Sequence, residues 1–333
     1  MEVDTNKEIV LGIDLGGTKI ATALFDNGGN ILYRDSRMLG KIHGQETGKV
    51  VSHCLKDLMK IAESFGKSVS SVGISIPGIS RIDKGTVWAP NIPGWDDYPL
   101  LEEVKVITGD IPVIIDSDRV CHLMGEVWKG NASGCSNAVF IAVGTGIGAG
   151  IMVNGEILRG SSDISGAVGW MALHRPFRQE YIQYGCFEYQ ASGEGIARTA
   201  RVHIAGDKSY KGALLKKDPG EITSYEVIDE FRKGDPLAVR VIKECIGYWG
   251  MAAANLVSIL NPEKIIFGGG IFGPLTDLIP DIKKEATKWA QPIAVRQVDF
   301  DVSGLGSDAA IFGAGYMALK SCNIKHNPDP EDA

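Results

Sequence analysis

The chain has 333 residues, of which 44% are hydrophobic and 23% charged, and its formal net charge is −7. This length allows about two domains of a soluble globular protein. The acidic balance predicts neither nucleic acid nor an anionic membrane as a partner. The sequence contains no run of about 18 apolar residues, so no membrane span is predicted. The first eight residues lack the apolar region of a signal peptide, so we expect a cytoplasmic protein.

The first part of the chain is predicted to form one sheet with helices, a complete α/β domain. Residues 9–34 are typical of a three-stranded antiparallel meander, because alternating strands are separated by glycine turns at 16–17 and 27–30. Apolar spacing and turn residues predict the further elements of this part, which are a helix over 45–65, strands over 71–76 and 111–115, and a helix over 119–129.

A second meander is predicted over 138–159, and its first turn is Gly144-Thr145-Gly146. The chain is then rich in loops to about residue 185, after which helices dominate. The expected elements of this part are helices over 188–203, 236–260 and 308–319, and a strand over 264–267 that enters a helix through Gly268-Gly269-Gly270. The order βββ-α-β-α-β-α thus occurs once in each half. This repeat predicts two similar domains with the site in the cleft between them.

The glycine run at 144–149 formally matches the GxGxxG/A fingerprint of dinucleotide-binding proteins. That fingerprint requires a helix to begin within the glycines, whereas residues 150–158 alternate and turn at Asn154-Gly155 like a hairpin. The sequence also contains no GxxxxGK[ST] motif. Two glycine hairpins about one domain apart instead favour a fold that brings backbone N–H groups close to nucleotide phosphates. They therefore indicate a phosphoryl-transfer enzyme.

Asp14 lies on an apolar strand just before Gly16-Gly17, where an ionised carboxylate is costly unless a cation or hydrogen-bond donors face it. One interpretation is that Asp14 holds Mg²⁺ through water beside the phosphates. The other is a turn-forming Asp that caps nearby backbone groups. Thr18 offers a hydroxyl and an N–H to phosphate, whereas Lys19 is open to interpretation as a solvated strand residue.

Asp118 follows a short strand and opens a helix, so helix capping would be a sufficient role for it. A carboxylate at the C-terminal end of a strand also suits a general base, which accepts the proton of a substrate hydroxyl as that oxygen attacks the γ-phosphorus. Asp116 is a rival for this role, and the sequence does not exclude it. Gly268-Gly269-Gly270 would suit either the floor of an adenine pocket or a tight packing turn.

Together these motifs resemble those of the ROK family of bacterial sugar kinases, within the actin/hexokinase-like ATPase superfold. The resemblance runs from Ile9 to about Leu319. Each motif is weak alone, but the set in this order is highly specific. The matching motifs are residues 12–19 (GIDLGGTK), 73–78 (GISIPG), 91–95 (NIPGW), Asp118 through Gly125-Glu126, 144–150 (GTGIGAG), 185–188 (GCFE), 261–263 (NPE) with the triple glycine, and 305–309 (LGSDA).

The resemblance implies an α/β, two-lobed actin-like ATPase (ribonuclease H-like) fold, in which each lobe is a mixed sheet flanked by helices and a cleft lies between the lobes. Residues 1–118 plus 308–333 would form a small N-terminal lobe, and residues 119–307 a large C-terminal lobe. The resemblance further implies ATP and Mg²⁺ as cofactors and a sugar or sugar derivative as substrate. A homodimer would be usual for similar proteins.

By position, the resemblance assigns Asp118 as the catalytic base in the phosphorylation of a sugar hydroxyl. The substrate-binding residues expected on this basis are Asn91, Ser117, Asp118, Trp170 and Glu188. The residues expected to bind Mg·ATP, with Asp14 holding Mg²⁺ through water, are Asp14, Gly16, Gly17, Thr18, Lys19, Gly144, Thr145, Gly146, Gly148, Gly268, Gly269 and Gly270.

The sequence departs from the family pattern at the sugar and zinc motifs. Ser117 replaces the usual Asn before the base, and residues 167–170 (AVGW) stand in place of a Glu-x-Gly-His segment that binds sugar hydroxyls. The family's structural zinc uses that His and three cysteines, of which only Cys186 remains. Gln179 and Tyr181 stand where two of the thiols would be. His174 is nearby, but one Cys and one His do not make a tetrahedral site, so we expect no structural zinc.

The altered pocket predicts a substrate other than ordinary free glucose. Without the Glu and His of the family pattern, the site leaves no polar group unpaired when a sugar lacks the hydroxyls that they would bind. The substrate would lack a hydroxyl, carry a substituent or be a glycoside that stacks on Trp170. Alternatively, Trp170 merely fills the space of the missing zinc loop.

Two other functions stay open, a non-catalytic sugar-binding regulator and a pseudokinase. The family's repressors carry a DNA-binding helix-turn-helix ahead of the kinase core. Because only eight residues precede the first strand here and the net charge is acidic, we expect no DNA binding.

Overall fold

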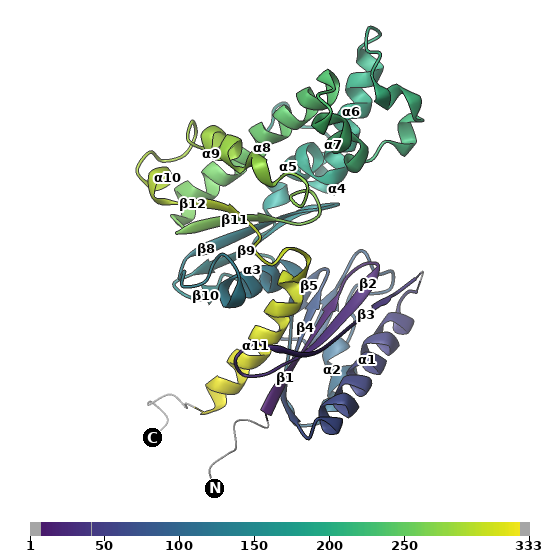
Figure 1. The fold of residues 1–333 in the computed structure, drawn as a ribbon, viewed down its shortest axis with the longest axis vertical. Helices are drawn as coiled ribbons and strands as arrows, with labels where there is room; N and C mark the ends of the chain where they lie inside the picture. The colour runs from purple at the N-terminus through teal and green to yellow at the C-terminus, as the bar shows by residue number, and fades with distance from the viewer. Residues whose placement is uncertain (1–7, 41, 327–333) are drawn as a thin grey trace. The chain divides into compact units, whose positions relative to one another are not determined.

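The computed structural model describes residues 8–40 and 42–326, which divide into two compact units (Figure 1). The first unit runs to Gly134 and also contains Arg159–Ser165 and the chain from Ser307 onward. The second unit comprises Cys135–Leu158 and Gly166–Gly306. The first unit therefore includes the helix after Asp118, which a lobe boundary at 118 would assign to the second.

A five-stranded sheet in the order β3-β2-β1-β4-β7 forms the first unit's centre. The first three strands pair antiparallel, which confirms the predicted meander, and the last two continue the sheet parallel to the first. The strands of this sheet are β1 (Glu8–Leu15), β2 (Lys19–Phe25), β3 (Ile31–Met38), β4 (Ser68–Ile76) and β7 (Val113–Ser117). A small ribbon of β5 (Ile79–Arg81) and β6 (Thr86–Trp88) follows β4.

Helices cover both faces of this sheet (Figure 1). They are α1 (Gln45–Ser64), α2 (Leu100–Thr108), α3 (Asp118–Lys129) and α11 (Ala309–His326). Successive side chains of a strand point to opposite faces. Accordingly, Ile9 and Leu11 pack with α1 and α2, whereas Val10 packs with α11.

α11 lies so close to α3 and β4 that only glycine fits at the contacts. A β-carbon added at Gly125 of α3 would lie 2.0 Å from the Ala309 carbonyl oxygen, and one at Gly313 of α11 would lie 1.8 Å from the Cys121 carbonyl oxygen. At Gly73 of β4 the corresponding distance to the Ala314 carbonyl oxygen is 1.9 Å. Because α3 begins at Asp118, this backbone contact fixes the helix that carries the expected catalytic base.

The second unit repeats the first unit's topology in the order β10-β9-β8-β11-β12. Its first three strands pair antiparallel, and the last two run parallel to β8. The strands are β8 (Ala138–Val143), β9 (Ile147–Val153), β10 (Glu156–Ile157), β11 (Lys264–Gly268) and β12 (Asp299–Val302). The repeat of the strand pattern expected from the sequence is therefore confirmed.

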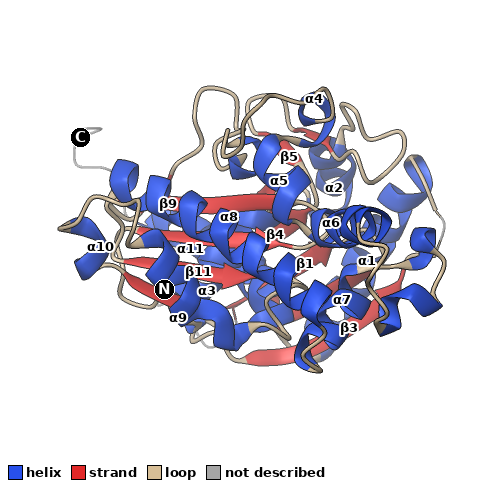
Figure 2. Ribbon diagram, turned by 90° about the horizontal axis from the view of Figure 1, so that it is seen from above, coloured by secondary structure: helices blue, strands red, loops and turns tan. Residues whose placement is uncertain are grey.

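The second unit's helices gather over its sheet (Figure 2). They are α4 (Tyr181–Tyr184), α5 (Cys186–Ala191), α6 (Gly193–Gly206), α7 (Ser224–Arg232), α8 (Pro236–Leu260), α9 (Ile279–Ala286) and α10 (Ala294–Gln297). The single helix predicted over 188–203 is wrong, because Ser192 adopts extended geometry and caps α6 by accepting the Gly195 N–H at 3.1 Å. The predicted strand-to-helix turn at 268–270 is also wrong, since turns continue to the short η4 (Thr276–Leu278).

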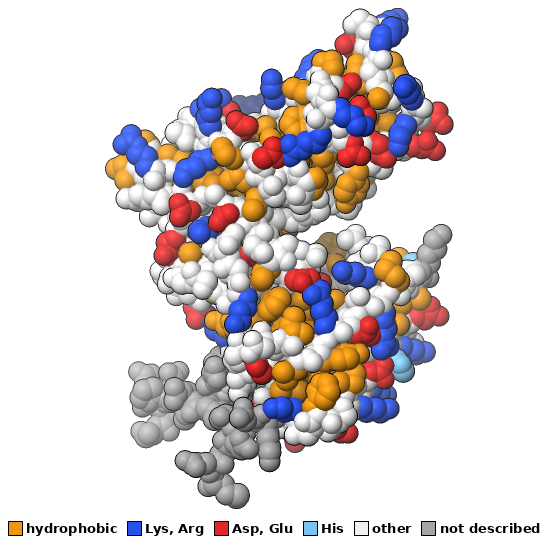
Figure 3. All heavy atoms as spheres, in the orientation of Figure 1, with side chains coloured by type: hydrophobic (Ala, Val, Ile, Leu, Met, Phe, Trp, Pro, Cys, Tyr) orange, Lys and Arg blue, Asp and Glu red, His pale blue; other side chains and the backbone are white. Residues whose placement is uncertain are grey.

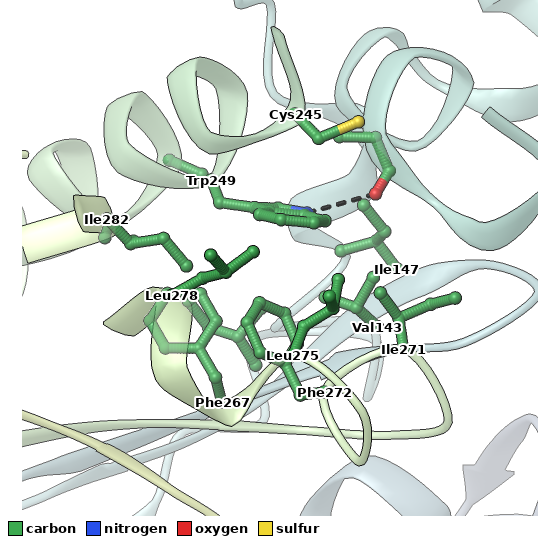
Figure 4. Packing of buried hydrophobic residues seen from close by; sticks show 14 of the residues in the cluster. Val143, Ile147, Cys245, Trp249, Phe267, Ile271, Phe272, Leu275, Leu278 and Ile282 are labelled. Atoms are coloured by element: carbon green, nitrogen blue, oxygen red, sulfur yellow. Dashed lines mark hydrogen bonds between the residues drawn. The ribbon is translucent and has the colours of Figure 1, made fainter. Parts of the chain in front are cut away.

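The core of the second unit centres on Trp249 of α8 (Figure 4). Its ring centroid lies 5.0 Å from that of Phe272, which lies 4.9 Å from that of Phe267 on β11. The indole N–H donates to the Ala191 carbonyl at 3.0 Å. These contacts tie α8 to the end of α5 and to the strand that enters the triple glycine.

Acidic and basic side chains are interspersed on the face drawn in Figure 3. Within the described part of the chain, none of the helices has the length and apolar content that a bilayer crossing demands. None of the six cysteines forms a disulfide there.

Gly125→Ala tests the contact between α3 and α11. Alanine normally favours a helix interior over glycine, but here the new methyl would meet the Ala309 carbonyl, so we expect a loss of about 1–3 kcal/mol in the free energy of unfolding. Urea unfolding monitored by circular dichroism measures it. The matched control is Gly247→Ala, inside α8, where an added β-carbon meets no atom within 4 Å. It should stabilise by about 0.5–1 kcal/mol, and equal effects of the two substitutions would contradict the contact.

Candidate active site

Three polar side chains lie side by side at the ends of neighbouring parallel strands in the first unit. Asp14 of β1 is in register with Ser75 of β4, which is in register with Asp116 of β7. The Ser75 hydroxyl donates to Asp14 Oδ1 at 2.8 Å. The carboxyl ends of parallel strands are where α/β sheets bind ligands. The fold therefore brings the two expected acidic regions, around Asp14 and Asp118, to one edge.

Asp118 is the first residue of α3 and is half-buried. It is not the helix cap, because the Ser117 hydroxyl accepts the Val120 N–H at 3.4 Å. Asp118 Oδ1 accepts the Arg119 N–H at 2.8 Å. Burial raises the pKa of the Asp118 carboxyl, while the charges of His122 and Arg119 act to lower it. A half-buried carboxyl with a raised pKa is well suited to accept a proton.

The rival Asp116 is fully engaged. Its side chain is 4% exposed, and Arg159 Nη2 lies 2.6 Å from Oδ2. Oδ1 accepts the Ser117 N–H at 2.7 Å. Burial raises the pKa of Asp116, and the Arg159 hydrogen bond is the largest effect that opposes it. With both oxygens already holding donors, Asp116 is poorly placed to take a proton from a substrate.

His122 is a member of this cluster that the sequence interpretation missed. Its Nδ1 lies 2.6 Å from the Asp118 backbone oxygen, one turn further along α3. A carbonyl only accepts, so Nδ1 carries the proton in this contact. The imidazole charge acts to lower the pKa of both Asp14 and Asp118. The spacing of four residues from Asp118 on a predicted helix was the signal for His122, whereas no local signal indicates Arg159.

The first glycine hairpin lies next to Asp14. The Gly16 N–H donates to the Lys19 carbonyl at 2.9 Å, which closes the turn and leaves Gly17, Thr18 and Lys19 exposed. Burial raises the pKa of Asp14, and the Lys19 charge is among the effects that lower it. Lys19 itself is exposed, and its role toward phosphate stays a prediction.

The second glycine turn belongs to the second unit. The Gly144 N–H donates to the Gly146 carbonyl at 2.9 Å, and the Gly193 N–H donates to the Gly144 carbonyl at 2.7 Å. β9 starts at Ile147, so no helix begins within the glycines, which confirms the exclusion of the dinucleotide fingerprint. Thr145 is exposed at the tip. Gly148, which is expected to bind Mg·ATP, is buried in β9 opposite Ala142.

Glu188 supports this turn from α5. Its Oε2 accepts the Ile147 N–H at 2.7 Å. A β-carbon added at Gly146 would lie only 2.7 Å from the same oxygen, so Glu188 packs directly against this glycine. Burial raises the pKa of Glu188, while this hydrogen bond acts to lower it. One oxygen of the expected sugar contact is thus already committed to the backbone of the glycine turn.

An added β-carbon would clash at the first two residues of the triple glycine but not at the third. A β-carbon at Gly268 would lie 2.2 Å from the Phe140 ring, and one at Gly269 would lie 2.4 Å from the Val143 carbonyl oxygen. Gly269 also has a φ of +86°, which favours glycine. Gly270 is exposed and its nearest neighbour would be 3.3 Å away. Packing between β11 and β8 therefore accounts for the first two.

Trp170 ends a short 3₁₀ helix, η1 (Val168–Trp170), and is 55% exposed. The preceding Gly169 packs on the glycine turn, since a β-carbon there would lie 2.7 Å from the Ile147 oxygen and 3.1 Å from Glu188 Cβ. Trp170 and Glu188 thus lie on adjoining segments of the second unit. Asn91, in contrast, is exposed on a turn of the first unit.

The two units carry different parts of the expected site. The first holds Asn91, Ser117, Asp118 and the first hairpin with Asp14, and the second holds the turn at 144–146, Gly148, the triple glycine, Trp170 and Glu188. Among residues 8–40 and 42–326, no three His, Cys, Asp or Glu side chains are grouped as a metal site. The absence of a structural zinc stays a prediction.

Comparison with known proteins identifies the family. The chain is 32% identical over 320 residues to a glucokinase of Halalkalibacterium halodurans, covering 94% of this chain and 96% of that protein. It is 30% identical to a xylose repressor of Caldicellulosiruptor bescii, covering 95% of this chain and 80% of the repressor. A Streptomyces griseus ROK family glucokinase, solved with glucose and AMPPNP, matches with 26% identity and a TM-score of 0.74, covering 94% and 99% of the two chains. The ROK family model matches residues 10–321, and the chain belongs to the ROK family, with its actin-like ATPase fold.

Proposed function

We propose that this chain transfers the γ-phosphoryl group of ATP to a hydroxyl of a sugar or sugar derivative, with Asp118 as general base. A carbohydrate kinase is the enzyme class of this chain, as the relatives named glucokinase support. The observation that carries the role of Asp118 is the engagement of its neighbour. Arg159 and the Ser117 N–H occupy both oxygens of Asp116, whereas Asp118 lies half-buried at the helix start and accepts a backbone N–H on Oδ1.

Asp118 would accept the proton of the sugar hydroxyl as that oxygen attacks the γ-phosphorus. The bond from the γ-phosphorus to the oxygen that bridges the β- and γ-phosphates would break, and ADP would leave with that oxygen. Charge stabilisation and positioning do most of the work in such transfers. Asp14 would hold Mg²⁺ through water, because Ser75 binds only its Oδ1. When bound, Mg²⁺ would neutralise charge on the phosphates. The backbone N–H groups of Gly17, Thr18 and Thr145, on the exposed turns, would face phosphate oxygens.

The two glycine turns fit a nucleotide because some of their glycines have no other reason to be there. A β-carbon at Gly17 or Gly144 would meet no atom within 4 Å. Neither residue is among the glycines with positive φ. Packing and backbone conformation therefore do not require glycine at these positions. An approaching phosphate would, since a methyl group would occupy its place.

Asp118→Asn tests the general base. We expect kcat to fall by several orders of magnitude while the KM for ATP stays within about twofold, since the carboxylate acts on the sugar hydroxyl rather than on nucleotide binding. ADP release with a panel of sugars measures both values. Asp110→Asn, at an exposed turn, is the matched control and should leave both unchanged. A near-wild-type rate in the Asp118 variant would remove Asp118 from the chemistry. Sugar binding without any ADP release in the wild type would favour a regulator or pseudokinase.

Gly144→Ala tests the proposed phosphate turn. Because the methyl meets no protein atom, we expect an unchanged melting temperature but a KM for ATP at least about tenfold higher. Gly269→Ala should show the reverse, with a lower melting temperature, because its φ is positive and its β-carbon would meet the Val143 carbonyl. Differential scanning fluorimetry and ATP titrations separate the two effects. An unchanged ATP KM in the Gly144 variant would contradict a phosphate role.

The second unit also supports a substrate class. Exposed aromatic rings beside polar groups bind the apolar faces of sugars, and Trp170 lies next to the segment that contacts Glu188. Ala167 and Trp170 stand where the family pattern has a carboxylate and an imidazole, so two demands on sugar hydroxyls are missing. The proposed substrate is therefore a sugar that lacks a hydroxyl or carries a substituent, or a glycoside, rather than free glucose.

The double variant Ala167→Glu/Trp170→His tests this class. We expect it to raise kcat/KM for glucose relative to that for the best wild-type substrate by at least about tenfold, because the introduced carboxylate and imidazole would hydrogen-bond to matching sugar hydroxyls. The wild-type panel contains glucose, N-acetyl sugars, glycosides and ketoses. Trp170→Phe, which keeps an apolar ring, is the control and should retain the wild-type order. Glucose as the best wild-type substrate would refute the altered pocket.

A further inference from the structure

A cluster of four rings holds the segment between η1 and α5, and we call His174, Tyr181, Tyr189 and Tyr248 the aromatic lock. The Tyr248 hydroxyl and His174 Nδ1 are hydrogen-bonded at 2.9 Å. Tyr181 meets the rings of His174 and Tyr189 edge-on, with centroids 6.5 Å and 5.4 Å away. The four residues come from a loop, α4, α5 and α8. The lock thus joins segments that are distant in sequence.

Further contacts anchor the lock to its surroundings. Gln190 Nε2 donates to the Tyr181 hydroxyl at 2.7 Å. Arg198 of α6 places its guanidinium carbon 4.1 Å from the Tyr189 ring centroid and donates through Nη1 to the Tyr189 carbonyl at 2.8 Å. Cation–π and edge-on aromatic contacts stabilise a packed segment beyond simple burial. Together they fix the segment against three helices.

The phenols of Tyr248 and Tyr181 stay neutral at physiological pH. Burial raises the pKa of Tyr248 to about 12 and also raises the pKa of Tyr181. Their hydroxyls therefore keep both donor and acceptor capacity.

The lock bears on the two side chains of this unit proposed to face the sugar. Glu188 immediately precedes Tyr189 on α5, and Trp170 lies at the other end of the segment. Where the segment meets α5, a β-carbon at Gly185 would lie 2.5 Å from the Gly169 oxygen, so the backbone there packs directly on η1. Movement of the locked segment would displace both Trp170 and Glu188.

The same place does not fit the zinc that the family resemblance implies. Structural zinc takes four Cys or His ligands in tetrahedral geometry. Here Cys186 is buried beside Tyr181, and His174 Nδ1 already contacts the Tyr248 hydroxyl. Among the residues described, these side chains form no metal-binding group.

We propose that the aromatic lock does without metal what a bound ion would do, and positions Trp170 and Glu188 for the sugar. This inference rests on the proposed sugar kinase function for its kinetic consequence. Its structural consequence, a segment held by rings and hydroxyls without zinc, stands on the contacts alone.

Tyr248→Phe and Tyr181→Phe test the lock, since each removes one hydroxyl and keeps the ring. We expect each to raise the KM for the sugar about fivefold, the size of one neutral hydrogen bond, with kcat and the KM for ATP within about twofold. Tyr210→Phe is the matched control. It removes a buried hydroxyl of the same unit that donates to Asp235 at 2.9 Å, away from the segment, and should leave the sugar KM unchanged.

Two readouts need no catalysis. Trypsin cleavage after the exposed Arg178, followed by mass spectrometry, should be about fivefold faster in the Tyr248 and Tyr181 variants than in wild type, but unchanged in the Tyr210 variant. Metal analysis of the purified protein should find far less than one zinc per chain, and EDTA treatment followed by dialysis should not change the cleavage rate.

Near-stoichiometric zinc would overturn the proposal, as would Tyr248→Phe and Tyr181→Phe behaving like Tyr210→Phe in both cleavage and sugar KM. If the wild type phosphorylates no sugar, the proposed function fails. The cleavage and metal measurements then still decide whether the lock exists.

Discussion

The first unit depends on how it accommodates carboxylates at one sheet edge. Asp14 and Asp116 sit at neighbouring strand ends, and Asp118 follows two residues later. Removing such groups from water is costly unless they are paired. A different group compensates the burial of each carboxyl. The Arg159 guanidinium pairs with Asp116, and the Ser75 hydroxyl donates to Asp14. The His122 imidazole acts to lower the pKa of Asp14 and Asp118. Of these three carboxyls, only Asp116 forms a salt bridge among the described residues, and burial raises the pKa of both Asp14 and Asp118. The Mg²⁺·phosphate group and the substrate hydroxyl of the proposed function would complement these two carboxyls.

The repeated topology explains why one chain offers two glycine turns of unequal character. In both units the first strand turns through glycine into an antiparallel partner, and parallel strands follow on its other side. The first unit puts carboxylates at the parallel strand ends, whereas the second puts glycines there, at Gly268 and Gly269. The two copies of one pattern thus place carboxylates in one case and tightly packed glycines in the other at the parallel strand ends. In the second copy, Glu188 accepts a backbone N–H of the glycine turn, so this polar side chain already has a structural role without a ligand.

Sequence periodicity predicted the elements whose signals are local. α8 matches the expected 236–260 because its ends carry visible signals: Asp235 accepts two N–H groups at the start, and Asn261 adopts the left-handed conformation at the end. The expected 188–203 helix failed because Ser192 can cap as well as continue a helix. The site divides the same way. Asp14 and Asp118 follow from strand ends and glycine turns, but Arg159 reaches Asp116 from 43 residues away, a pairing that no local pattern encodes.

The altered segment from Ala167 to Cys186 links specificity to stability. A metal site fixes a loop through a few strong bonds and requires particular ligands at particular places. A cluster of rings fixes it through buried area and tolerates changes that preserve volume. Once His174, Tyr181 and Tyr248 hold the loop, no residue of the segment has to serve as a metal ligand. Under the proposed function, the side chain at Trp170 would then be set by the substrate and not by a metal. On this argument the loss of the zinc motif and the change of the sugar motif are one event, because a single residue, the histidine of the family pattern, served both.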